Sequence, residues 1–518
     1  MRRLFALLTV AIIFMAFVVP TTVQASSSPP TFVTIIHTND FHGNLLGFTP
    51  PLAGNIAGGS ARIATLVEEI RASAPGIVLL LDAGDATQGT MVSNYFNGVA
   101  VIDVMNYMGY DVMEIGNHEF DFGQGALAAN AGYATFPFLC ANIKVSASGE
   151  TPPFCKPYVI IEKGGKRIAI FGLITPDTPV LTHPKNIVGL TFVDPIETAA
   201  ELVPKLQPNA DLIIALTHIG YDMDRQLGEE VGGINVIVGG HSHTMISVPE
   251  RLGNSGGNAI IVQAWESGKV VGRLDLEMRG NAIVRFSGGL INVSAGIAED
   301  STVKAMVEGY AAQLSEAMKE VVGYTLVPLV GDRTLIRTQE TNLGDLVADM
   351  MRWAAGPDVQ IALTNGGGIR WHRTFPVGPI TRGDVYELLP YGNVLVMMDL
   401  TGAQIRQALE NGVSEWQLVA GRFSQVSGLK FTFDPTRPAG SRIIDVWVGG
   451  TPLVDTAVYR VATNDFMAAG GDGYTVLTQG TNYVSTGTTL MDYMVQYLLQ
   501  FSPVSPAVEG RIVNLSSP

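Results

Sequence analysis

The sequence predicts an α/β protein of two domains that are joined by a helix. Short runs of Ile, Val and Leu alternate with helical stretches from Thr31 to about Met278, and each run ends at a polar or Gly-containing loop. Such runs are typical of strands that are buried on both faces of an α/β sandwich. The 518 residues, 47% hydrophobic and 15% charged, are enough for two or three compact domains.

Six of these runs define the strands of a first domain, which we place at residues 31–295. They cover residues 33–37, 77–81, 112–115, 167–173, 212–217 and 236–238. Carboxylate, amide or imidazole side chains directly follow five of them. Because a sheet holds the loops at its strand ends in place, functional residues gather there. We therefore expect the functional site of this domain at these strand ends.

A helix and a second domain follow. Residues 301–321 have helical periodicity and good helix formers, so we assign residues 296–322 to a connecting helix and hinge region. After Gly323 His becomes rarer, and Gly-rich turns occur at NGGG, PYGN and GGDG. This change in composition indicates a second domain at residues 323–518.

The N-terminus has the features of a secretory signal peptide. Arg2 and Arg3 precede an apolar run at residues 4–19, and Val23-Gln24-Ala25 ends in a small residue, as a signal-peptide cleavage site does. We expect residues 1–25 to be removed after Ala25. The alternative is an uncleaved membrane anchor, for which the run is short. The sequence thus predicts a secreted protein, periplasmic or extracellular, without stable membrane insertion.

The sequence has two cysteines, Cys140 and Cys155, whose state depends on whether the protein is exported. In an exported chain they could pair, closing a loop of about 15 residues for roughly 3 kcal/mol. The alternative is two separate buried thiols. We favour the disulfide.

The net charge of −15 argues against a nucleic-acid polymer as partner. No basic stripe is available to neutralise a run of phosphates. A small anionic ligand remains possible, because a few arginines suffice for one phosphate group.

Six of the eight histidines lie in four short segments of the first domain, beside acids and amides. Each residue alone has an ordinary explanation, such as turn chemistry for an Asp in a Gly-rich loop. Five mixed donors after five separate strands are better explained by a bound cation. Carboxylate, imidazole and amide ligands without thiolate favour Zn, Mn, Co or Fe. Two such ions about 3.5–4 Å apart would support in-line displacement at phosphorus by an activated water.

The segments HTNDFHGN, GDATQG, GNHEFDFG, THIG and GGHSH resemble the calcineurin-like metallophosphoesterases. With NGGGIR and GGDGY added, nearly everything after residue 31 resembles the 5′-nucleotidase family, which includes periplasmic UDP-sugar hydrolases and animal ecto-5′-nucleotidases. The resemblance implies an N-terminal four-layer αββα sandwich, a connecting helix and a C-terminal α+β substrate-binding domain. It also implies two divalent metal ions, with Zn, Mn or Co expected.

The resemblance assigns the metal ligands and a catalytic dyad. The first ion is implied to bind Asp40, His42, Asp85 and His243. The second is implied to bind Asp85, Asn117, His218 and His241, with Asp85 as the bridge. Some relatives have Gln at the position of His243, which makes this ligand the least certain, and His37 has no role in the metal site. His118 and Asp121 resemble the dyad, whose imidazolium would stabilise charge in the transition state.

The resemblance also assigns substrate-binding residues in the second domain. Arginines would bind phosphate through their planar guanidinium groups, two aromatic residues would sandwich the nucleobase, and polar residues would contact the base and the ribose. These residues are Arg333, Arg337, Asn365, Arg370, Tyr391, Asn393, Phe466 and Asp472. Tyr391 stands where relatives usually have Phe.

We therefore expect an enzyme that releases phosphate from nucleotides, with 5′-nucleotides first and with UDP-sugars, di- and triphosphates as further substrates. One alternative is a 2′,3′-cyclic-nucleotide 2′-phosphodiesterase with 3′-nucleotidase activity, and another is a thiosulfohydrolase of sulfur oxidation. A third is a non-catalytic binding protein, against which the intact dyad argues. The metals and the substrate residues fall in different domains, so the domains must close for turnover. The chain is expected to be a monomer or dimer.

Overall fold

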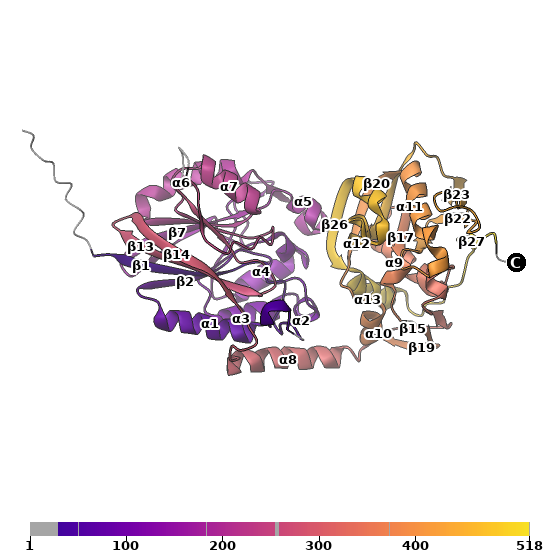
Figure 1. The fold of residues 1–518 in the computed structure, drawn as a ribbon, viewed down its shortest axis with the longest axis horizontal. Coiled ribbons are helices and arrows are strands. Elements are labelled where there is room, and N and C mark those ends of the chain that lie inside the picture. Colours follow the sequence, from indigo (N-terminus) through magenta and orange to yellow (C-terminus); the bar gives the residue numbers. More distant parts are fainter. Residues whose placement is uncertain (1–28, 50, 183, 254–257, 372, 517–518) are drawn as a thin grey trace, which may run out of the picture.

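The computed structural model describes residues 29–49, 51–182, 184–253, 258–371 and 373–516. The expected signal peptide therefore lies outside the described residues. Two domains lie side by side, with helix α8 (Ser301–Ala317) running along one side between them (Figure 1). Among the described residues, no helix is both long and apolar enough to cross a membrane.

The N-terminal domain contains two six-stranded sheets. The first consists, in spatial order, of β14 (Ala282–Asn292), β13 (Val270–Arg279), β1 (Thr31–Thr38), β2 (Ile77–Asp82), β3 (Val112–Glu114) and β4 (Phe138–Leu139). The second consists of β11 (Glu250–Arg251), β12 (Ile260–Gln263), β10 (Val236–Gly239), β9 (Leu212–His218), β7 (Lys166–Ile174) and β6 (Tyr158–Lys163). All six predicted strands form. Neighbouring strands from β1 to β4 are parallel, as are those from β12 to β7.

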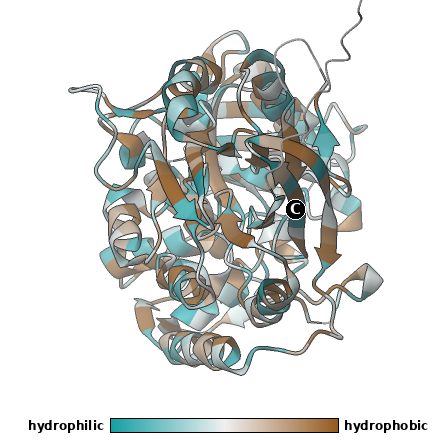
Figure 2. Cartoon of the chain, turned by 90° about the vertical axis from the view of Figure 1, so that its left-hand side faces the viewer, coloured by the Kyte–Doolittle hydropathy of each residue, from teal (hydrophilic) through white to brown (hydrophobic). Residues whose placement is uncertain are grey.

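Helices cover the outer face of each sheet, which gives the expected αββα order (Figure 1). The first sheet packs on α1 (Ser60–Ser73), α3 (Val99–Met108), α4 (Gly123–Tyr133) and α8. The second packs on α6 (Pro195–Leu206) and α7 (Tyr221–Glu230). Aliphatic side chains fill the space between the two sheets. Seen from the N-terminal side, hydrophobic strands lie in the interior between helices of mixed character (Figure 2).

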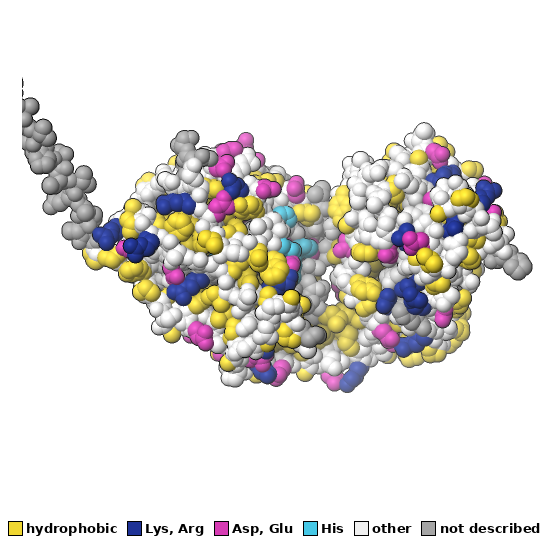
Figure 3. Space-filling view, in the orientation of Figure 1, with side chains coloured by type: hydrophobic (Ala, Val, Ile, Leu, Met, Phe, Trp, Pro, Cys, Tyr) yellow, Lys and Arg dark blue, Asp and Glu magenta, His cyan; other side chains and the backbone are white. Residues whose placement is uncertain are grey.

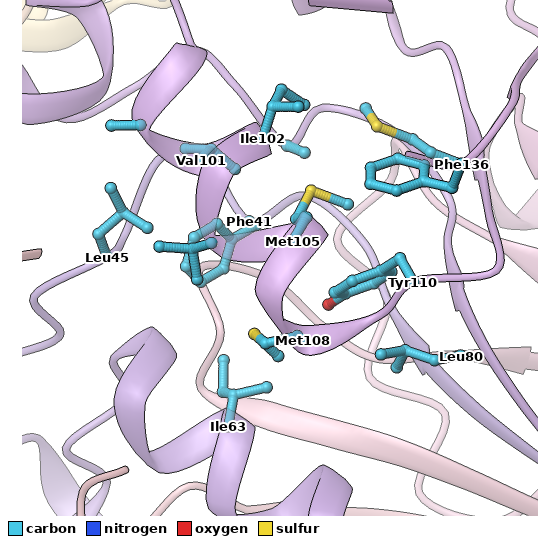
Figure 4. Packing of buried hydrophobic residues seen from close by; sticks show 14 of the residues in the cluster. Phe41, Leu45, Ile63, Leu80, Val101, Ile102, Met105, Met108, Tyr110 and Phe136 are labelled. Carbon is cyan, nitrogen blue, oxygen red and sulfur yellow. The ribbon is translucent and has the colours of Figure 1, made fainter. Parts of the chain in front are cut away.

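The core beneath the first sheet anchors the loop that follows β1. Phe41 is buried and packs near Ile63 of α1 and Met105 of α3 (Figure 4). Its neighbours in the chain are Asp40 and His42, two of the expected metal ligands. Burying a large aromatic side chain contributes about 1.5–3 kcal/mol. The core therefore fixes the backbone of this loop.

Helix α8 belongs largely to the N-terminal domain. Val303, Val307 and Leu314 are buried in the same core as α1 and α3. The helix ends at Ala317, four residues before the predicted end at 321, because residue 321 already starts β15 (Val321–Thr325). Residues 318–320 thus connect the helix to the second domain.

The C-terminal domain is an α+β structure around a five-stranded sheet. Its strands, in order, are β21 (Ser424–Ser427), β17 (Ile361–Asn365), β25 (Val458–Asn464), β20 (Val394–Thr401) and β26 (Thr481–Thr489). A second sheet contains β24 (Thr451–Pro452), β23 (Ile443–Val448), β22 (Leu429–Phe433) and β27 (Ile512–Asn514). Helices α9 (Asn342–Ala355), α10 (Arg382–Leu388) and α13 (Leu490–Phe501) form one core, and α11 (Gly402–Ser414) and α12 (Asp465–Ala468) another.

The structure pairs Cys140 and Cys155 in a disulfide, with their Cα atoms 5.9 Å apart. This confirms the favoured of the two alternatives. The bridge links the residue after β4 to the segment before β6.

Candidate active site

Five polar residues converge where parallel strands of the two sheets end. Asp40, Asp85 and Asn117 follow β1, β2 and β3 of the first sheet. His218 ends β9, and His241 follows β10, in the second sheet. The site is therefore built from both sheets. Histidine side chains are visible on the face of the N-terminal domain that is turned toward the other domain (Figure 3).

The expected ligands form two compact clusters. One contains Asp40, His42 and His243, and the other contains Asp85, His218 and His241. In each cluster the three ligand atoms lie within 4.8 Å of one another, close enough for one metal ion to bind all three. His37, in contrast, is buried beside Gly272 in the sheet, which agrees with a structural role.

Hydrogen bonds set the orientation of the imidazoles. Nδ1 of His42 faces the carbonyl oxygen of Gln88 at 3.1 Å, and Nδ1 of His218 faces that of Ala83 at 2.7 Å. A carbonyl oxygen only accepts, so Nδ1 carries the hydrogen in both rings. In neutral imidazoles this leaves the Nε2 lone pair as the metal ligand, and both Nε2 atoms face their cluster.

The acceptors that meet in each cluster fit a cation. Nε2 of His42 lies 3.2 Å from Nε2 of His243, which lies 3.3 Å from Oδ1 of Asp40. In the other cluster Nε2 of His218 lies 3.0 Å from Oδ2 of Asp85. A bound cation would relieve the repulsion between these lone pairs and charges.

Asn117, beside the second cluster, supports the same conclusion. Oδ1 of Asn117 is buried and has no hydrogen-bond partner among the described residues, as expected for an oxygen that binds a cation. Burial alone would raise the pKa of Asp85, but the positive charges that His218, His118 and His42 carry when they are protonated hold this pKa well below its ordinary value. Asp85 is therefore an ionised carboxylate.

Five of the seven expected ligands have left-handed backbone. The φ angles are +48° at Asp40, +49° at His42, +55° at Asp85, +75° at His241 and +52° at His243. This conformation is unfavourable for residues with a Cβ atom and collects at functional sites. The close packing also requires glycine at position 116, where a Cβ atom would lie 2.2 Å from Oδ1 of Asp85.

His118 and Asp121 form the expected pair. Nδ1 of His118 lies 2.6 Å from Oδ2 of Asp121, and Oγ1 of Thr182 donates to the other carboxylate oxygen. Burial alone would lower the pKa of His118, but the charges of Asp121 and Asp85 and this hydrogen bond raise it to about 10. The ring is thus favoured in its protonated form and can stabilise a negative charge.

Glu119 joins the two central loops, although the sequence analysis assigned it no role. Its carboxylate accepts from the backbone N–H groups of Asp85, Ala86 and Thr87 and from that of Gly116. It is buried. Its place within GNHEFDFG was an available signal, but only the structure shows that it spans two loops.

The C-terminal domain contributes a separate pocket of about 400 Å³. Seven of the eight expected substrate residues line it, together with three glycines, and Arg333 does not. The lining residues are Arg337, Asn365, Gly367, Gly368, Arg370, Tyr391, Asn393, Gly421, Phe466 and Asp472. Sequence positions that are more than a hundred residues apart thus meet in one pocket.

Three arginines give the pocket a positive charge. Burial and the nearby charges of Arg333 and Arg370 lower the pKa of Arg337. In the part of the chain that the structure describes, none of the three forms an ion pair. Guanidinium groups that are close together and lack carboxylate partners fit an anion such as phosphate.

Polar contacts position the remaining pocket residues. Nδ2 of Asn365 donates to Asp472 at 2.7 Å, and Nδ2 of Asn393 donates to Asp465 at 2.9 Å. The sequence does not predict a role for Asp465. It indicates a role only for its neighbour Phe466, and no sequence pattern indicates the contact with Asn393. Tyr391 and Phe466 expose 56% and 45% of their surface, which leaves ring faces open to a ligand.

The metal clusters and the pocket share no residue among those that the structure describes. Instead, strand β26 contacts the dyad: a Cβ atom on Gly487 would lie 1.9 Å from Oδ1 of Asp121. A second cavity of about 530 Å³ lies beside this contact and is lined by both domains, including Asp121 and Arg382.

Comparisons with known proteins agree with this architecture. A family model described as calcineurin-like phosphoesterase matches residues 33–245, and one described as 5′-nucleotidase, C-terminal domain, matches residues 321–479. The trifunctional nucleotide phosphoesterase protein YfkN of Bacillus subtilis is 36% identical over 94% of the chain, which spans 35% of that relative. The snake venom 5′-nucleotidase of Crotalus adamanteus is 35% identical over 93% of the chain and 88% of its own length. Human 5′-nucleotidase is 32% identical over 93% and 90%, respectively.

Solved structures show the same fold. A 5′-nucleotidase precursor from Thermus thermophilus is 40% identical, covers 94% of this chain and all of its own, and superposes with a TM-score of 0.59. The NAD nucleotidase of Haemophilus influenzae has a TM-score of 0.79 at 23% identity, over 95% of this chain and all of its own, which supports the fold alone. The chain therefore belongs to the 5′-nucleotidase family and is a metallophosphoesterase of the 5′-nucleotidase type.

Proposed function

We propose that this protein is a secreted 5′-nucleotidase that uses two divalent metal ions, of Zn, Mn or Co, to release phosphate from nucleoside monophosphates. The observation that carries the proposal is the combination of two metal-binding clusters in one domain with a pocket of unpaired arginines and open aromatic rings in the other. In such a combination the metal ions and arginines are complementary to the phosphate, and the polar and aromatic side chains of the pocket are complementary to the ribose and the base.

Asp40, His42, His243 and Asp85 would hold the first ion, and Asp85, Asn117, His218 and His241 the second. When bound, the ions would activate a water for in-line attack and neutralise charge on the phosphoryl oxygens. His118 would donate a hydrogen bond from Nε2 to a phosphoryl oxygen as charge develops there. Asp121 would keep this ring protonated and oriented through Nδ1.

The pocket residues would bind and orient the nucleotide. Arg337 and Arg370 would bind its phosphate, with Arg333 at the edge adding positive charge. Tyr391 and Phe466 would stack on the base, an interaction that all bases share because each has a π face. Asp472 would accept from the ribose hydroxyls, while Asn365 would hold its carboxylate, and Asn393 would contact the base.

The two halves must approach one another before hydrolysis. The pocket is lined only by C-terminal residues, so the domains would rotate to bring it to the metals. Residues 318–320, after the rigidly packed α8, are the proposed pivot, which refines the hinge expected over the whole helix. Superposition with the Thermus protein supports this rotation, because a TM-score of 0.59 at 40% identity is expected when domains meet at different angles.

A second activity is favoured by one observation. YfkN, which is 36% identical, carries the name of a trifunctional nucleotide phosphoesterase. This name supports more than one nucleotide substrate for the same site, and we propose cyclic 2′,3′-nucleotides, 3′-nucleotides and UDP-sugars, which the sequence analysis considered, as the further candidates. Three features support secretion: the signal-peptide pattern at residues 1–25, the Cys140–Cys155 disulfide and the venom origin of several relatives.

The test is an assay of phosphate release from AMP, 3′-AMP, cyclic 2′,3′-AMP and UDP-glucose, with the metal-free protein reloaded with Zn, Mn or Co. We expect AMP to be hydrolysed with the highest kcat/KM and only after reloading. Release from cyclic 2′,3′-AMP but not from AMP would favour the alternative. Activity that persists without metal would exclude the two-metal mechanism.

A further inference from the structure

His243 differs from the other ligand histidines in its surroundings. Its side chain is 39% exposed, whereas that of His218 is fully buried. Packing against the core therefore restricts the rotation of the His243 ring only weakly. Its Nδ1 atom nevertheless has a specific partner, because it lies 3.0 Å from Oε2 of Glu266.

Glu266 is held in place by the loop that carries it, between β12 and β13. The flanking residues Trp265 and Ser267 both have left-handed backbone, with φ of +55° and +56°. The carbonyl oxygen of Trp265 accepts from Asn39 at 2.7 Å, and the N–H of Ser267 donates to the carbonyl oxygen of Asp40 at 2.7 Å. The loop of Glu266 is thus tied to the loop of the first metal cluster.

Each carboxylate oxygen of Glu266 has one partner. Oε1 accepts from Nζ of Lys269 at 2.5 Å, and Oε2 faces His243. The ammonium of Lys269 in turn lies 4.4 Å from the centre of the Trp265 ring. These contacts fix the carboxylate, so that it presents a lone pair to Nδ1 of His243.

We propose that Glu266 is a positioning residue for the first metal site. By accepting a hydrogen bond from Nδ1 of His243, it leaves Nε2 free to bind the ion and holds the ring toward Asp40 and His42. The carboxylate also makes the imidazole a stronger ligand, since partners of this kind raise the basicity of the metal-binding nitrogen. This inference rests on the proposed two-metal function and adds a residue to it.

The inference predicts an effect on one site only. His42 and His218 donate from Nδ1 to backbone carbonyls, which no side-chain substitution removes. Glu266 pairs with His243 of the first cluster, whereas the second cluster is formed by Asp85, His218 and His241. Loss of the carboxylate should therefore weaken the first site and leave the second unchanged.

The experiment compares metal binding by metal-free wild type, Glu266→Ala and Glu266→Gln, titrated with Mn²⁺ or Zn²⁺ against a chromogenic chelator. We expect Glu266→Ala to weaken one of two sites by about 10- to 100-fold, and Glu266→Gln to weaken it less, because its amide oxygen still accepts. Glu250→Ala is the matched control, since Glu250 is a similarly half-buried carboxylate of the same domain that pairs with Arg225 and Tyr221.

A double-mutant cycle shows whether Glu266 acts through His243. In the His243→Ala background, Glu266→Ala should cause no further loss of affinity. Two outcomes would overturn the inference: unchanged affinity of both sites in Glu266→Ala, or an equal loss with and without His243. The wild-type arm tests the proposed function separately, because a wild type that binds fewer than two ions contradicts the two-metal mechanism and the inference together.

Discussion

The two halves of the site differ in how far they are organised before substrate binds. In the N-terminal domain Asp40, Asp85, Asn117 and His218 are almost fully buried, and backbone hydrogen bonds join the loops of Asp40 and Asp85. In the C-terminal domain Tyr391 and Phe466 are about half exposed. Five of the seven expected metal ligands have left-handed backbone, and Phe41, beside two of them, is held in the core. The arginines of the pocket, in contrast, have no ion-pair partner within the described part of the chain.

This difference fits the chemistry that we propose for each half. A metal ion needs several ligand atoms at fixed separation. The rest of the fold must therefore offset the unfavourable energy of buried charges and strained backbone before the ion binds. A nucleotide has to enter and leave, so its pocket stays open and positively charged until the domains close. Substitutions in the first half should therefore abolish chemistry, and those in the second should weaken binding.

The largest effect is expected for Asp85→Ala, which removes the proposed bridge between the two ions. Both sites should lose affinity, and phosphate release from AMP should fall by more than the roughly 10²- to 10⁴-fold typical of losing an acid–base group. Metal analysis and AMP hydrolysis measure this. Asp103→Asn, which alters a carboxylate that accepts from Tyr133 and Tyr310, is the control. Retention of both ions would contradict the bridging role.

His118→Ala should separate metal binding from catalysis. His118 belongs to neither cluster, so both ions should remain bound while kcat falls by about 10²- to 10⁴-fold. Steady-state kinetics with AMP, combined with metal analysis, tests this. An unchanged kcat would show that the dyad does not act on the phosphoryl group.

Arg337→Met should act mainly on KM. A hydrogen bond to a charged group contributes about 1.5–3 kcal/mol, so KM for AMP should rise by about 10- to 100-fold with metal content unchanged. Arg285→Met, at an exposed arginine on β14, is the matched control. If the two variants have the same KM, the pocket arginines do not bind phosphate.

The smallest effect is expected for Phe466→Ala. Stacking on a base contributes about 1–3 kcal/mol, and the half-exposed ring places Phe466 near 1 kcal/mol, or about fivefold in KM for AMP. Ribose 5-phosphate has no base, so its KM should not change. A similar rise for both substrates would mean that Phe466 supports the pocket and does not stack on the base.

Most of the fold was predictable because it depends on local patterns. The six apolar runs form strands, and the polar residue after each of five becomes part of a cluster or lies beside one. The end of α8 was predicted too late, since residues 318–321 have no strong helix breaker and pairing of β15 with β19 (Gly378–Thr381) decides the boundary. Pairing of distant strands cannot be read from periodicity alone.

The sequence by itself determined which candidate ligands gather at the strand ends, because side chains that directly follow buried strands are placed by the strands themselves. The tertiary structure alone decided how these side chains are supported. Glu266 reaches His243 from 23 positions away, and Asp465 reaches Asn393 from 72 away. Such contacts depend on how loops of different strands approach one another, and no local pattern records that. The separation of the expected metal ligands and substrate residues between two domains was already expected from the sequence, and the structure adds that the metal clusters and the pocket share no described residue.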